Sequence, residues 1–217
     1  MKYIFIVLAL WCCSISGWAQ KDSMVIKKPK YSVRNGNSGR ISWNPKKTKA
    51  EIISDKVNSD GFRYILGSER ATSVDYDTHY LLVSLGAYEK GDVQGYFLHW
   101  RYVWNVEPRI KEGSPVLLKL GDNSRIELTI DNVYIPLPNI TVVYNTTIKT
   151  YNASFWTNIA AEDIDKLEKG LTKIRVEIDN APFDVVLKKD NISQFLIDEY
   201  NLIKEQLKEK KTFYDDF

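Results

Sequence analysis

Residues 95–108 read GYFLHWRYVWNVEP, and their alternation indicates the fold class. In an extended chain, successive side chains point to opposite faces of a sheet. One face of this stretch then carries only aliphatic or aromatic side chains: Tyr96, Leu98, Trp100, Tyr102, Trp104 and Val106. The other face is mixed and carries Phe97, His99, Arg101, Val103 and Asn105. Burying a large ring stabilises a fold by roughly 2–3 kcal/mol, so we predict that the ring-bearing face packs in a core.

The alternative is that these rings form a platform for a carbohydrate. Sugar rings have apolar C–H faces that stack on Trp and Tyr, and residue types alone do not separate stacking from packing. Even if the rings are core, the opposite face offers a small mixed patch. The candidate ligand-binding residues are therefore Trp100, Tyr102, Trp104, His99, Arg101 and Trp156.

The same period of two continues on both sides of this stretch. RIELTID (125–131) and KIRVEID (173–179) alternate in the way expected of half-buried strands. Turn sequences GDNS (121–124) and NAP (180–182) separate strand candidates. The further candidates are Phe62–Leu66, Thr72–Tyr76, Tyr80–Tyr88, Val116–Leu120, Ile140–Thr150 and Phe183–Leu187. Short strands at this spacing predict a mainly β fold, an antiparallel sandwich or a barrel-like sheet.

Two segments have helical character. Residues 160–170 (AAEDIDKLEKG) have acids first, lysines later and a glycine stop, which predicts a short internal helix. A C-terminal amphipathic helix is expected from about Asn191 to Lys210, with Asn191 and Gln194 as a capping pair. Its polar side is expected to include Asp198, Glu199, Lys204, Glu205 and Lys208, and its apolar stripe Ile192, Phe195, Leu196, Ile203 and Leu207.

The N-terminus resembles a secretory signal peptide. Lys2 precedes an apolar stretch that ends in Gly17-Trp18-Ala19, so residues 1–19 are expected to be removed, together with Cys12 and Cys13. Residues 20–60 are expected to be a basic, flexible leader, since residues 21–56 carry ten Lys or Arg and three Asp or Glu. Residues 61–217 are expected to form one β-rich domain. The predicted location is exported: periplasmic, outer-membrane-associated or secreted, with no transmembrane span after signal removal.

Few residues suggest a catalytic centre. Asp75, Asp77 and His79 alternate in VDYDTH and could in principle share a metal ion. Such a run is more typical of the solvent-exposed face of a strand, so we predict no metal and no cofactor. Glycoside hydrolysis needs two carboxylates in one cleft, and Glu107 is the best single candidate. Export argues against nucleic acid as the partner.

The segments KEGSPVLLKLGDNSRIELT (111–129) and EDIDKLEKGLTKIRVEI (162–178), together with the signal peptide, resemble a group of small exported β-rich proteins of Gram-negative gut bacteria. The group has no established activity, so the resemblance implies no catalytic residue. We expect an exported, non-enzymatic binding or structural module of the bacterial envelope, for a glycan or another protein. The alternative is a hydrolase acting on extracellular carbohydrate.

Overall fold

The computed structural model describes residues 49–74, 80–144 and 146–209, all of which belong to the unit Lys46–Phe217. The strands are β1 (Ile52–Val57), β2 (Arg63–Gly67), β3 (Arg70–Val74), β4 (Tyr80–Lys90), β5 (Val93–Trp104), β6 (Pro115–Leu120), β7 (Arg125–Tyr134), β8 (Asn139–Val143), β9 (Thr146–Ile159), β10 (Leu171–Ile178) and β11 (Ala181–Val186). The helical elements are α2 (Ala161–Asp165), the 3₁₀ helix η2 (Lys166–Lys169) and α3 (Ser193–Leu207).

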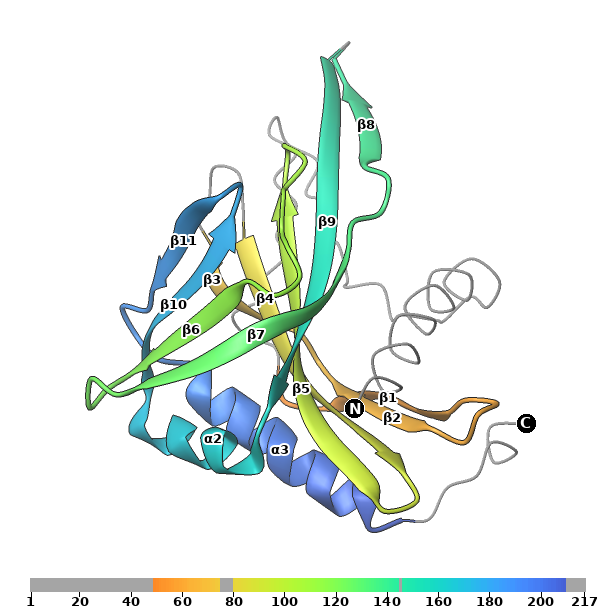
Figure 1. The fold of residues 1–217 in the computed structure, drawn as a ribbon. Coiled ribbons are helices and arrows are strands. Elements are labelled where there is room, and N and C mark those ends of the chain that lie inside the picture. The colour runs from red at the N-terminus through yellow and green to blue at the C-terminus, as the bar shows by residue number, and fades with distance from the viewer. Residues whose placement is uncertain (1–48, 75–79, 145, 210–217) are drawn as a thin grey trace. The chain divides into compact units, whose positions relative to one another are not determined.

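All eleven strands belong to one antiparallel sheet, which does not close on itself (Figure 1). Its main path is β1-β2-β4-β5-β9-β7-β6-β10-β11, while β3 pairs with β4 and β8 pairs with β9. The long strand β7 joins two parts of the sheet, because its first half pairs with β6 and its second half with β9. The predicted mainly β, antiparallel, sandwich-like fold with two helical segments is confirmed.

The core forms because the apolar faces of both parts of the sheet are buried. In the β4-β5-β9 part, Trp100 lies between Val83 and Phe155 in the strand register. In the β7-β6-β10-β11 part, the alternating side chains point inward on every strand. The buried members there are Val116, Leu118, Leu120, Ile126, Leu128, Ile130, Ile174, Val176, Ile178 and Val185. The period of two thus predicts correctly which side of each of these strands is buried.

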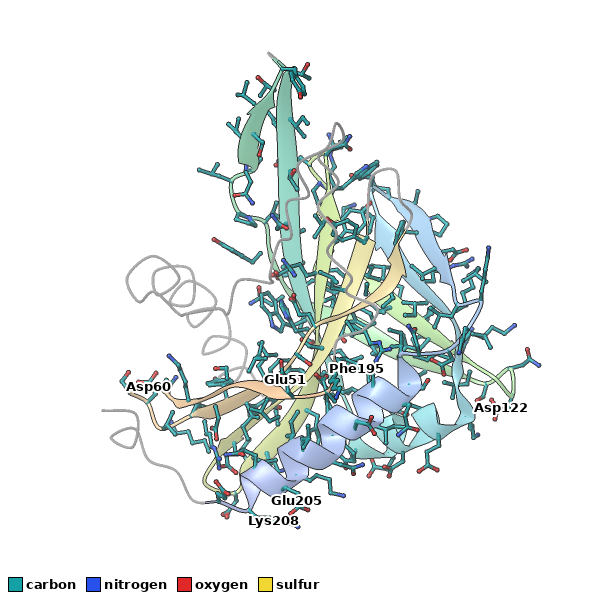
Figure 2. All side chains as sticks on the ribbon, turned by 180° about the vertical axis from the view of Figure 1, so that it is seen from behind. Glu51, Asp60, Asp122, Phe195, Glu205 and Lys208 are labelled. Carbon is teal, nitrogen blue, oxygen red and sulfur yellow. The ribbon has the colours of Figure 1, made fainter. Side chains whose placement is uncertain are left out.

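Helix α3 lies against β4, β2 and β1 (Figure 1). Figure 2 shows Phe195 at the sheet side of this helix, with Glu205 and Lys208 toward its C-terminal end. The predicted apolar stripe is buried or packed on the core. The predicted capping pair is wrong, since the carboxylate of Asp190 accepts the N–H groups of Ile192 and Ser193, each at 3.0 Å.

Apart from shifts of a few residues at the ends of elements, the structure differs from the predicted boundaries at three places. Residues 140–150, expected as one strand, contain a turn at Tyr144 (φ 47°) that divides them between β8 and β9. The second half of β9, from Tyr151 to Ile159, is a strand that was not predicted. Strand β1 lies inside the expected leader and pairs with β2, so the described part of the sheet includes residues before Gly61.

The predicted signal peptide and most of the predicted leader lie outside the described residues. Within the described part of the chain, neither helix is long and apolar enough to cross a membrane.

Candidate ligand-binding face

The six candidate ligand-binding residues fall on two opposite faces of the sheet. Trp100 and Tyr102 are each 1% exposed in the core, and Trp104 packs against that core. The indole N–H of Trp100 donates to Oγ1 of Thr157 at 3.1 Å, so its one polar group is satisfied internally. These rings therefore pack in the core, as the alternation of the strand predicts, and Trp100 and Tyr102 present almost no surface to a ligand.

The other three candidates come together on the reverse side of the same strands. We call this surface the outer face and define it by Phe97, His99 and Arg101 of β5 and Ser154, Trp156 and Asn158 of β9. The strand register pairs Phe97 with Asn158, His99 with Trp156, and Arg101 with Ser154. The rings of His99 and Trp156 stack with centroids 5.0 Å apart and planes 24° apart. The outer face thus joins a stacked pair of rings to polar side chains.

A β-bulge adds an acidic group to this face. Leu66 pairs with Gly86 and Arg70 with Val83, so four steps along β2 and β3 match three steps along β4. The extra residue lies at Ser68-Glu69, between the two strands. Bulges commonly redirect a side chain, and here Glu69 reaches Arg101. Nε of Arg101 donates to Oε1 of Glu69 at 3.0 Å, and Nη2 donates to Oε2 of the same carboxylate.

His99 is neutral at physiological pH. Burial lowers the pKa of its imidazole to about 4, and Arg101 lowers it further, while Glu69 raises it. Its Nδ1 lies 3.8 Å from Oε1 of Glu69 and has no hydrogen-bond partner among the described residues. Glu69 and Arg101 form an ion pair joined by two hydrogen bonds. Glu69, Arg101 and His99 together therefore carry no net charge at pH 7.

A second unpaired polar group lies next to His99. Ser84 of β4 is the direct cross-strand neighbour of His99 and is fully buried. Its hydroxyl has no hydrogen-bond partner within residues 49–74, 80–144 and 146–209. Buried polar groups without a partner are uncommon in folded proteins. Here two such groups, Nδ1 of His99 and the hydroxyl of Ser84, lie on adjacent paired strands.

At one end of the outer face, the ring of Phe97 lies directly over Gly86 and the ring of Tyr88 directly over Gly95. A Cβ at Gly86 would lie 2.2 Å from the ring of Phe97, and one at Gly95 would lie 2.4 Å from the hydroxyl of Tyr88. The carboxylate of Asp131 accepts the N–H of Asn158 at 2.8 Å, and burial raises the pKa of this carboxyl. The outer face thus has a carboxylate at each end: Glu69 bonded to Arg101, and Asp131 bonded to the N–H of Asn158.

The bulge also organises the opposite side of the sheet. Glu199 of α3, expected on a polar helix surface, is fully buried, and Oε2 of its carboxyl accepts the N–H of Leu85 at 2.8 Å. The hydroxyl of Ser68 donates its single proton to the carbonyl of Lys49 at 2.8 Å. The same hydroxyl lies 3.1 Å from Oε1 of Glu199, so its one proton is shared between the two acceptors. Burial raises the pKa of Glu199 to about 8.

Neither Glu69 nor Glu199 was singled out from the sequence. Both depend on the bulge, and an acid in a helix or a loop gives no sign of its burial. The expected polar position of Glu199 is wrong because the gap between β2 and β3 leaves the N–H of Leu85 without a strand partner, and the carboxyl fills that gap.

The remaining candidates are not brought into this site. Glu107 is exposed beyond the end of β5, and Asp75, Asp77 and His79 lie outside the described residues. Within residues 49–74, 80–144 and 146–209, no three His, Cys, Asp or Glu side chains gather as metal ligands. The chain matches no protein-family profile, no curated protein and no solved structure.

Proposed function

We propose that this protein is an exported, non-enzymatic binding module of the bacterial envelope that takes a neutral glycan on its outer face. The observation that carries the proposal is the stack of His99 on Trp156 beside the Glu69–Arg101 pair. Ring surfaces accept the C–H faces of sugars, and a fixed ion pair offers hydrogen-bond donors and acceptors to hydroxyl groups. The export step rests on the N-terminal sequence.

The charge of the outer face favours a neutral ligand over an anionic one. Arg101 is compensated by Glu69, His99 is uncharged, and Asp131 adds a carboxylate at the margin. An acidic polysaccharide would meet no uncompensated cation among these residues and would be repelled by Asp131. A neutral polysaccharide incurs no such penalty and can bond with Ser154 and Asn158.

The outer face is held rigid before any ligand arrives. Glu69 and Arg101 fix each other through two hydrogen bonds, and their side chains remain 22% and 31% exposed. Cross-strand pairing fixes His99 against Trp156. A preorganised site loses less side-chain entropy on binding, which suits weak, repeated contacts along a polymer.

The test is a binding screen with neutral oligosaccharides and uronic-acid oligosaccharides, using wild type, Trp156→Ala and Tyr144→Ala. Tyr144 is 98% exposed in the turn between β8 and β9 and serves as the matched aromatic control. We expect neutral ligands to bind wild type and Tyr144→Ala, with affinity roughly tenfold lower in Trp156→Ala, equivalent to about 1.4 kcal/mol. An Arg101→Ala variant with an unchanged melting temperature provides a second reading if Trp156→Ala unfolds.

Exclusive binding of acidic glycans would overturn the proposal. Neutral-glycan binding that is the same in wild type, Trp156→Ala and Arg101→Ala would also overturn it.

A further inference from the structure

The hairpin of β8 and the first part of β9 extends away from the rest of the sheet (Figure 1). Ile140 and Val142 of β8 are 63% and 66% exposed. Ile148 of β9 is also exposed, but it pairs with Thr141 and therefore lies on the other side of the ribbon. Ile140 and Val142 alternate, so they share one side of the ribbon. An exposed group of aliphatic side chains on a two-stranded ribbon is a common sign of an interaction surface.

Strand β8 also offers an open backbone edge. It pairs with β9 on one side and with no other described strand. Every second residue of an antiparallel edge strand turns its N–H and C=O away from its partner. These groups can accept a further strand by main-chain hydrogen bonding.

The edge of β8 differs from the two ends of the main sheet path. The end strand β1 contains Asp55 and Lys56, and the end strand β11 contains Pro182 and Asp184. Charges and proline at an edge are the usual protection against strand addition. The sequence of β8, NITVV, contains neither.

We infer that two copies of this protein pair through their β8 edges in an antiparallel, two-fold symmetric arrangement. This inference goes beyond the proposed glycan binding and does not depend on it. A pairing centred on Thr141 places Ile140 of one copy opposite Val142 of the other, twice in each dimer. The exposed aliphatic side chains are therefore self-complementary, which a two-fold interface requires.

Charge also fits a second copy. Lys149, opposite Ile140 on β9, is the one charged residue within Asn139–Val143 and Thr146–Thr150. In the order β9-β8-β8-β9, the two lysines are separated by three strand spacings, roughly 14 Å. This exceeds the Debye length of about 8 Å at physiological ionic strength, so repulsion between them is screened. A strongly charged partner strand would find no complementary charge on β8.

The first test measures the molar mass of the exported form of the protein in solution, by light scattering over a range of concentrations. Wild type is expected to form a dimer as concentration rises. Val142→Lys should raise the dissociation constant at least about tenfold, because it removes both Ile140–Val142 pairs of the dimer and adds two like charges. Val186→Lys is the matched control, since Val186 is 67% exposed on the edge strand β11.

The second test is disulfide formation by Thr141→Cys. Opposite residues of an antiparallel pair have Cα atoms about 4.5–5.5 Å apart, within reach of a disulfide. The variant should give a covalent dimer on oxidation, and wild type is the control for Cys12 and Cys13. A chain that stays monomeric and does not cross-link would overturn the inference, as would a dimer unaffected by Val142→Lys or an interface formed only with a different envelope protein.

Discussion

Replacing Glu199 by glutamine is expected to remove a large pH dependence of stability. The buried carboxyl has a pKa of about 8 in the folded protein, against about 4.3 in an unfolded chain. A raised folded pKa means that the stabilisation is complete below about pH 4 and is lost as pH rises to about 8. Each pH unit between these values costs about 1.4 kcal/mol, so the loss from pH 5 to pH 8 is roughly 4 kcal/mol.

Glutamine is a close structural match for the protonated acid. Its oxygen can accept the N–H of Leu85, and its amide can donate to Ser68. We therefore expect Glu199→Gln and wild type to have similar free energies of unfolding at pH 5, and the variant to be more stable by roughly 4 kcal/mol at pH 8.

The assay is urea denaturation of both proteins at pH 5, 6, 7 and 8. Glu205→Gln on the exposed side of α3 is the control and should follow wild type. If the free energy of unfolding depends on pH in the same way in wild type and Glu199→Gln, the reasoning is refuted, since Glu199 would then be ionised in the folded state.

Three further outcomes are expected. Trp100→Ala should lower the free energy of unfolding by about 3–5 kcal/mol, because the ring is buried and its N–H is bonded to Thr157; a loss below about 1 kcal/mol in a denaturation experiment would contradict the core position. Asp190→Ala should lower the free energy of unfolding by about 1–2 kcal/mol. It should also speed hydrogen exchange of the Ser193 N–H, because the Asp190 carboxylate accepts that N–H at the start of α3; an unchanged exchange rate would contradict this capping role. The imidazole of His99 should titrate near pH 4 by NMR, and since its folded pKa is lowered, stability should fall as pH drops from about 6.5 toward 4; a midpoint near 6.5 would show that the ring is hydrated.

The sheet was largely predictable because alternation survives wherever one face is buried. In RIELTID and KIRVEID the aliphatic residues are the buried ones, and the charged residues are exposed or half-buried. The second half of β9 was not predicted, because its inward positions include Ala153 and Thr157, which weaken the contrast between its faces. The turn at Tyr144 was not predicted because Tyr gives no local turn signal.

The candidate site was only partly predictable for a different reason. His99 and Arg101 were placed on one face by the alternation of a single strand, and Trp156 was added as a further aromatic. Glu69 joins them through a bulge that depends on the pairing of β2 and β3 with β4. Glu199 is buried by the same bulge from the opposite side. Such groups are positioned by contacts between distant segments, which local periodicity does not record.

The indole N–H signals of Trp156 and Trp100 give the most direct test of the glycan-binding proposal. They lie on opposite faces of adjacent strands, one on the outer face and one in the core. In an NMR titration with a neutral oligosaccharide that binds, the Trp156 signal should shift while that of Trp100 stays in place. A titration in which the Trp156 signal does not move while bound ligand shifts residues elsewhere would contradict the account.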